Sequence, residues 1–159
     1  MSERLLEVEG LALTAGGRTV VEAVEFVLAA GQHLAVIGPN GAGKSTLIHA
    51  LIGDVAPAAG SIRLAGRALA DWPARERACR VALLPQASAL GFPFTVAEVV
   101  RLGRGPHASG SVADRDIVAQ TLAACDIAHL RERAYTQLSG GEKQRVQLAR
   151  VMSQIWRAE

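Results

Sequence analysis

The stretch GPNGAGKST, residues 38–46, brings together glycines, a lysine and two neighbouring hydroxyl groups. Glycines lack a Cβ, so successive backbone amides can turn inward and surround an anion. The ammonium of Lys44 can reach the terminal oxygens of a phosphate chain, and the hydroxyl of Ser45 can ligate Mg²⁺. This spacing therefore indicates a cradle for the phosphates of a nucleotide.

The residues on either side supply the elements that such a cradle needs. HLAVI, residues 33–37, is typical of a short apolar strand, and LIHALI, residues 47–52, has the pattern of a helix. The strand would deliver the loop, and the positive N-terminal end of the helix would face the phosphates. The sequence thus matches a P-loop, a pattern found in kinases, GTPases and transport ATPases. The expected nucleotide-binding residues are Gly38, Pro39, Asn40, Gly41, Ala42, Gly43, Lys44, Ser45 and Thr46.

A second pair of glycines occurs in LSGGE, residues 138–142. Ser139 and Glu142 fit a capping box, in which two side chains satisfy free amides at the start of a helix, so a plain helix start is one interpretation. Paired glycines at such a place cost backbone entropy unless something must approach closely. The other interpretation is a second phosphate site, made by exposed amides, the serine hydroxyl and the positive helix end.

Together these motifs resemble the ATP-binding subunit of ABC transporters. GPNGAGKST resembles that family's Walker A loop, LPQ with Gln86 resembles its Q-loop, and LSGGEKQRVQLAR, residues 138–150, resembles its signature motif and helix. The three motifs occur in the family's order, and the resemblance covers the whole chain. It implies ATP and Mg²⁺ as cofactors, Lys44, Gln86 and Ser139 as catalytic residues, and Ser45 and Gln86 as metal ligands.

The resemblance also implies how two phosphate sites would be used. In the family, two subunits pair head to tail, and each ATP lies between the P-loop of one subunit and the signature helix of the other. Ser139, Gly140 and Gly141 would then contact the nucleotide of the partner in a homodimer.

The stretch ALLPQASALGFPFTVAEVVRLGRGPH, residues 82–107, resembles the importer branch for iron chelates and cobalamin, and most closely the hemin-import ATPases. The resemblance implies transmembrane permease subunits, an indirect link to a periplasmic binding protein, and a place on the cytoplasmic face of the inner membrane. Hemin is the expected cargo, with a ferric siderophore or cobalamin as alternatives. Phe92 and Phe94 lie where this family docks the permease, although both rings could instead fill a helical core.

Around these motifs, the chain changes from strand-rich to helical near Gln86. Expected strands cover residues 4–13, 19–30, 31–38, 61–66 and 80–86; expected helices cover 44–53, 71–79, 111–124 and 139–155, and another starts at a capping box of Thr95 and Glu98. The expected fold class is α/β, a P-loop NTPase core with a mixed or parallel sheet and an inserted helical subdomain. Residues 1–159 would be the N-terminal part of one ABC ATPase domain, with a nucleotide-binding core in 1–86 and the helical subdomain in 87–159.

Composition limits the alternatives. Half of the residues are hydrophobic and 20% are charged, as in soluble globular proteins, and a net charge of +2 is too small to favour nucleic acid as a partner. Cys79 and Cys125 have no partner at metal-ligand spacing, so we expect two small buried or half-buried thiols in a reducing compartment. Neither a signal peptide nor a run of ~18 apolar residues is expected, which favours a soluble, cytoplasmic protein.

Two features depart from the family. An aromatic residue that stacks on adenine usually precedes the second strand, but LTAGGRT, residues 13–19, has Ala15 and Gly16 near that place. The family's next strand, ending in an Asp and a Glu, and its switch His would come after residue 159. We therefore expect a core that is incomplete at the C-terminus, and hydrolysis slowed by roughly 10²–10⁴ without a general base. A truncated, non-catalytic remnant is one alternative, and an ABC ATPase of DNA repair or ribosomes is another.

Overall fold

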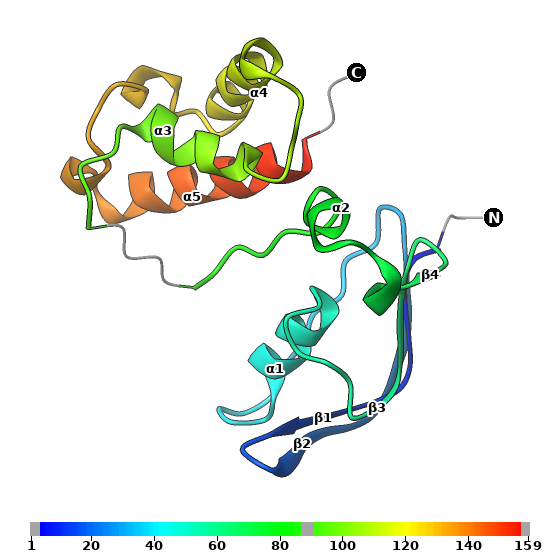
Figure 1. The fold of residues 1–159 in the computed structure, drawn as a ribbon. Coiled ribbons are helices and arrows are strands. Elements are labelled where there is room, and N and C mark those ends of the chain that lie inside the picture. Colours follow the sequence, from blue (N-terminus) through cyan, green and yellow to red (C-terminus); the bar gives the residue numbers. More distant parts are fainter. Residues whose placement is uncertain (1–3, 87–90, 157–159) are drawn as a thin grey trace. The chain divides into compact units, whose positions relative to one another are not determined.

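The computed structural model describes residues 4–86 and 91–156. The chain forms two compact units, Met1–Pro73 and Ala74–Glu159, which are described separately below (Figure 1). The second unit begins at Ala74, and residues shortly after Pro73 form hydrogen bonds with its helical part. Arg75 Nε donates to the carbonyl of Pro106 at 2.6 Å, and Gln154 Nε2 donates to that of Ala78 at 2.9 Å.

The first unit is built on an antiparallel sheet with the strand order β2-β1-β3-β4. The strands are β1 (Arg4–Ala15), β2 (Arg18–Ala29), β3 (Ala59–Leu64) and β4 (Arg67–Ala68). The structure confirms the strands predicted over residues 4–13, 19–30 and 61–66, which correspond to β1, β2 and β3. Gly16 and Gly17 have φ values of 57° and 76°, which suit the tight turn between β1 and β2.

Helix α1 (Lys44–Leu51) covers one face of this sheet and confirms the predicted helix after the loop. Leu47 and Ala50 are buried and belong to one apolar cluster with Val8, Leu13 and Ile62 of the strands. A 3-10 turn, η1 (Leu69–Asp71), adds Leu69 to the same core. This packing fixes α1, and therefore the loop that precedes it, against the sheet.

The second unit is helical. Its elements are α2 (Ala74–Ala78), α3 (Val96–Arg101), η2 (Leu102–Arg104), α4 (Ser111–Ala124), η3 (Ala128–Leu130), η4 (Tyr135–Gln137) and α5 (Gly140–Ile155). Its core contains Val96, Val99, Val118, Leu122, Ile127, Val146 and Ala149, which come from α3, α4, α5 and the turn before η3. The helices predicted to begin near Thr95, Ser111 and Ser139 are confirmed.

A buried arginine joins three parts of this unit. The Arg104 guanidinium, in η2, donates to Asp114 Oδ1 in α4 at 2.9 Å and to the Ser153 carbonyl in α5 at 2.6 Å. The Ser109 hydroxyl lies 3.0 Å from the same guanidinium. Gly103 permits the approach of η2 to α5, because a Cβ there would lie 2.2 Å from the Arg150 carbonyl oxygen.

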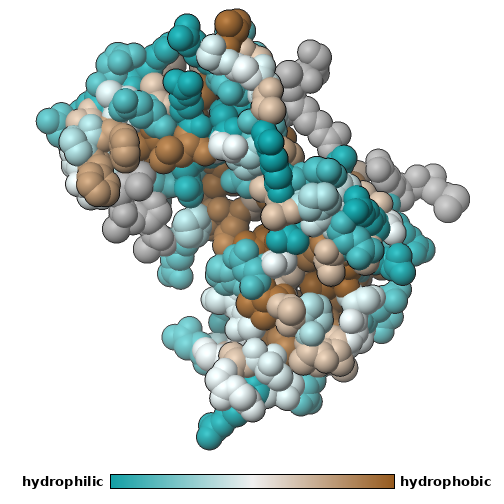
Figure 2. Space-filling model, viewed as in Figure 1, coloured by the Kyte–Doolittle hydropathy of each residue, from teal (hydrophilic) through white to brown (hydrophobic). Residues whose placement is uncertain are grey.

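The strands predicted over residues 31–38 and 80–86 are wrong, because these segments form no strand in the structure. A strand exists only where its backbone pairs with a neighbour, and every ladder among the described residues lies between β1, β2, β3 and β4. Leu34, Ile37 and Leu84 are consequently 49%, 91% and 46% exposed. In the space-filling view, apolar residues reach the surface in both units (Figure 2).

Candidate nucleotide-binding site

The glycine-rich loop places its backbone where only glycine fits. Gly41 and Gly43 have φ values of 81° and 84°, in the left-handed region that side chains disfavour. At Gly43, a Cβ would also lie 2.7 Å from the Val20 carbonyl oxygen and 2.8 Å from Val21 Cγ2. The loop therefore lies directly against β2, and Gly43 serves as the N-cap residue of α1.

The N-terminal end of α1 is left open to an anion. Gly43 offers no side chain to the first amides of the helix, and its first turn contains no acidic residue. In contrast, α3 and α5 both begin with a capping box, whose glutamate occupies the same position relative to the helix. Unsatisfied amides and the helix dipole give α1 a partial positive charge at the loop, which suits phosphate.

Lys44 begins α1, and its ammonium turns back over the loop. Lys44 Nζ donates to the carbonyl oxygens of Gly38 at 2.8 Å and Pro39 at 2.7 Å. Phosphate oxygens form stronger, charge-assisted bonds with an ammonium than neutral carbonyls do. A cavity of about 300 Å³ opens beside the loop, lined in part by Val20, Ala42 and Lys44. The residues present therefore fit a phosphate chain, and the Ser45 hydroxyl, which is exposed at the start of α1, fits a hard cation.

Gln86 belongs to the second unit, whereas Ser45 belongs to the first. The Gln86 residue is exposed and follows Leu84 and Pro85 along an extended segment. Each of these residues is described within its own unit, so the predicted sharing of one Mg²⁺ between Ser45 and Gln86 stays a prediction. Among the described residues, no group of three or more His, Cys, Asp or Glu side chains could hold a metal.

The signature segment forms the capping box that its sequence suggested. Ser139 is the N-cap residue of α5; its amide and its hydroxyl both donate to Glu142 Oε2, each at 2.7 Å. These bonds hold the pKa of the Glu142 carboxyl below its usual value, and Arg133, 3.7 Å away, acts in the same direction. The serine hydroxyl is therefore already engaged, and a phosphate would have to draw its hydrogen away from an ionised carboxylate.

Contacts among the described residues do not explain the two glycines that follow Ser139. A Cβ at Gly140 or at Gly141 would meet nothing within 4 Å, and neither residue has a positive φ. Each glycine nevertheless costs a helix about 0.5–1 kcal/mol relative to alanine. Both glycines therefore leave an open surface at the start of α5, and the choice between a plain helix start and a phosphate site stays open.

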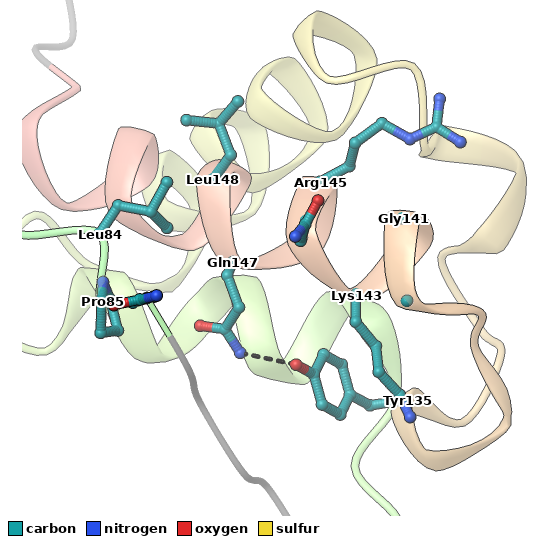
Figure 3. Close-up of a pocket in the computed structure, with 11 residues that line it drawn as sticks. Leu84, Pro85, Tyr135, Gly141, Lys143, Arg145, Gln147 and Leu148 are labelled. Carbon is teal, nitrogen blue, oxygen red and sulfur yellow. Dashed lines mark hydrogen bonds between the residues drawn. The ribbon is translucent and has the colours of Figure 1, made fainter.

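A pocket of about 670 Å³ lies along α5 beside the signature residues (Figure 3). Gln147, which is 6% exposed, donates through Nε2 to the Tyr135 hydroxyl at 3.0 Å, and Lys143 Nζ lies 5.9 Å from the centre of the Tyr135 ring. Gln147 Oε1 is buried and has no hydrogen-bond partner in the described part of the chain. Sequence reasoning missed Tyr135 and Gln147, because their proximity depends on how η4 packs on α5.

The predicted permease-docking aromatics are accessible. Phe92 is 69% exposed and Phe94 is 37% exposed, with ring centroids 6.1 Å apart, so neither ring fills the helical core. Residues 87–90 of the same stretch lie outside the described residues. At the expected place for adenine stacking, Ala15 ends β1 and Gly16 forms the turn, as the sequence indicated. No helix within the described residues has the length and apolar character to cross a membrane.

The first unit thus presents an open helix end behind a glycine loop, and the second presents a capped Ser-Gly-Gly helix. A family model described as "ABC transporter" matches residues 21–155, and the chain belongs to that family. The hemin import ATP-binding protein HmuV of Pseudomonas entomophila (strain L48) is 57% identical over 155 residues, covering 98% of this chain and 61% of the relative.

Two further comparisons agree with this family. HmuV of Gloeobacter violaceus is 54% identical over 156 residues, covering 97% of this chain and 57% of that relative. A solved structure of the ATP-binding subunit of an ABC transporter superposes with a TM-score of 0.79 at 31% identity, covering 94% of this chain and 62% of that chain. The predicted fold class, α/β with a P-loop NTPase core and a helical subdomain, is thus confirmed, although the sheet among the described residues is antiparallel rather than mixed or parallel. The chain spans 57–61% of the length of these two curated relatives.

Proposed function

We propose that this chain is the N-terminal part of the ATP-binding subunit of an ABC importer, and that its P-loop binds ATP with Mg²⁺. The observation that carries the proposal is the uncapped start of α1 behind Gly43, beside the ammonium of Lys44. On binding, Lys44 would exchange the carbonyls of Gly38 and Pro39 for phosphate oxygens. The loop amides would hold the phosphate chain. Residues 13–19 contain no aromatic side chain, so this segment would not stack on the adenine ring.

The hydroxyl of Ser45 and the side-chain amide oxygen of Gln86 are the proposed protein ligands of Mg²⁺, which neutralises charge on the phosphates when bound. Gln86 would also orient the attacking water. The proposed activity of the whole protein is ATP hydrolysis coupled to transport, and residues beyond this chain would supply its general base.

The proposed partner for the signature helix is a second copy of the protein. In a head-to-tail homodimer, Ser139 and the amides of Gly140 and Gly141 would contact the partner's nucleotide. The open surface over both glycines supports this assignment. When the Ser139 hydroxyl bonds to the partner's nucleotide, it would have to give up its hydrogen bond to Glu142. The capping box would therefore slightly oppose formation of the homodimer.

The proposed cargo is hemin, since both curated relatives described above are named for hemin import. Transmembrane permease subunits would dock near the exposed Phe92 and Phe94, on the cytoplasmic face of the inner membrane, with a periplasmic binding protein delivering cargo on the other side. Nucleic acid is not a proposed partner. Hemin should stimulate ATP hydrolysis only in the assembled transporter, and stimulation by a ferric siderophore or cobalamin instead would reassign the cargo.

Lys44→Ala tests ATP binding, and Arg63→Ala provides a matched control. Arg63 lies on β3 in the same unit, is exposed and carries the same charge, but is not part of the loop. We expect Lys44→Ala to reduce the affinity for a fluorescent ATP analogue at least ~100-fold, as for loss of a buried charge-assisted pair, and Arg63→Ala to leave it unchanged. Equal affinities in the two variants would refute the phosphate cradle. No measurable binding to the unchanged chain would favour the non-catalytic remnant.

A further inference from the structure

A cysteine and a histidine that are far apart in the sequence meet in the second unit. Cys79 follows α2, and its Sγ lies 3.7 Å from His107 Nδ1, after η2. His107 Nε2 lies 2.6 Å from the carbonyl oxygen of Gln154 in α5. A carbonyl oxygen only accepts, so Nε2 carries the hydrogen and the neutral ring turns the lone pair of Nδ1 toward the thiol. The arrangement is a nucleophile, a base and a group that orients the base.

The thiol of Cys79 is accessible, unlike the other thiol of the chain. Cys79 is half-buried and lines a cavity of about 340 Å³. The other residues of that cavity are Glu76, Arg80, Arg104, His107, Ser109 and Trp156. Cys125 is 7% exposed, its Sγ contacts Met152 Sδ at 3.6 Å, and burial raises the pKa of its thiol. One thiol is thus half-buried and the other buried, as the sequence predicted, and the two differ in their surroundings.

We propose that Cys79 is a site of covalent modification by low-molecular-weight disulfides, with His107 as the proton acceptor. His107 Nδ1 takes the thiol hydrogen, and the sulfur attacks one sulfur of the disulfide. A new S–S bond forms to Cys79 as the old one breaks, so that the Cys79 sulfur is oxidised and the departing sulfur is reduced. The departing thiolate takes a proton from the imidazolium, which restores the neutral ring.

Modification at this position would disturb the chain that leads to Gln86. The Cys79 sulfur also lies 3.7 Å from the Pro106 carbonyl oxygen, so a group added to it displaces both of its neighbours. Gln154 Nε2 donates to the carbonyls of Ala78 and Val81 on either side of Cys79. The modified thiol is therefore expected to loosen residues 78–86 from α5. This inference does not depend on ATP binding.

The test compares the native chain with the same chain in urea, using oxidised glutathione as the probe and peptide mass to locate the adduct. In the chain unfolded by urea, Cys79 and Cys125 should react with oxidised glutathione at similar rates. In the native chain, we expect Cys79 to react at least ~10-fold faster than Cys125 and faster than Cys79 in urea, since His107 Nδ1 lies in position to accept the thiol hydrogen during the attack. Slower reaction of native Cys79 than of unfolded Cys79 would overturn the proposal.

The variant His107→Gln tests whether fast reaction of Cys79 requires a proton acceptor or only an accessible thiol. Glutamine can still donate a hydrogen bond to the Gln154 carbonyl, but it does not accept a proton at neutral pH. We expect the rate at Cys79 to fall to the value found in urea or below, while Cys125 stays slow. An unchanged rate at Cys79 in a cooperatively folded His107→Gln variant would refute the role of His107. Hydrogen exchange of residues 78–86 should accelerate in the glutathione adduct, and unaltered exchange would refute the coupling to Gln86.

Discussion

Replacing Gly43 with alanine is expected to destabilise the first unit more than the same change at Gly41. Both residues have left-handed backbones, with φ values of 84° and 81°, so alanine costs about 1–2 kcal/mol at either position. The space around them differs. A Cβ at Gly43 would lie 2.7 Å from the Val20 carbonyl oxygen, whereas a Cβ at Gly41 would meet nothing within 4 Å.

That contact sets the expected difference between the two variants. Overpacking against backbone costs a further ~1–3 kcal/mol, because the Val20 carbonyl is held in β2 and cannot move aside as a flexible side chain would. The free energy of unfolding should therefore fall by roughly 2–5 kcal/mol in Gly43→Ala and by roughly 1–2 kcal/mol in Gly41→Ala. The difference between the two decreases in the free energy of unfolding excludes the backbone conformational cost, because both variants share it.

Urea unfolding followed by tryptophan fluorescence measures this difference. Trp72 is one of two tryptophans and lies in the first unit, where its Nε1 donates to the Leu64 carbonyl at 3.3 Å. In a Trp156→Phe background, Trp72 would report the first unit alone. Equal losses of stability in the two alanine variants would refute the reasoning, because they would mean that the loop can move away from β2 at no cost.

Three further changes test other contacts. Arg104→Met removes the cation beside the half-buried carboxylate of Asp114, which keeps only the hydrogen bond from the Ser109 hydroxyl among its described donors, and should cost about 3 kcal/mol, the lower end for breaking a buried pair. The exposed control Arg131→Met should cost about 0–1 kcal/mol, and similar melting temperatures for the two variants would contradict a structural role for the buried pair. The lowered pKa of Glu142 means that its cap stabilises the chain above its ordinary pKa of 4.5 and that this stability is lost as the pH falls through the lowered value. The difference in melting temperature between wild type and Glu142→Gln should consequently be largest at neutral pH and shrink in acid, and a constant difference would contradict the ionised cap. Ser139→Ala should weaken ATP-driven dimerisation, measured by light scattering, while sparing ATP binding to one protomer; an equal loss of both would contradict the split site.

Local signals in the sequence predicted their structures well. The capping boxes of Thr95 and Ser139 are confirmed because each depends on contacts between residues three positions apart. The glycine loop before α1 and the helix that follows were likewise predictable from neighbouring residues. The strands of β1 and β2 are joined by a short glycine turn, so their pairing is also nearly local.

The two strands predicted over residues 31–38 and 80–86 are wrong for the same reason. HLAVI and RVALLPQ are as apolar as true strands, but a strand needs a partner, and no partner for either is adjacent in the sequence. The division between the two units also depends on distant contacts, since the hydrogen bonds from Arg75 and Gln154 connect the α2 region to the other helices. Propensity alone contains no information about such partners.

The sequence by itself therefore determined the glycine loop, the capped helix α5 and the family, because these depend on residue types at short, fixed spacing. Only the tertiary structure decided which distant side chains meet. It brought Cys79 to His107, engaged the Ser139 hydroxyl, left Gly140 and Gly141 uncovered, and placed Arg104 between three elements. Such contacts arise from the packing of whole helices, which brings together residues whose separation along the chain carries no signal.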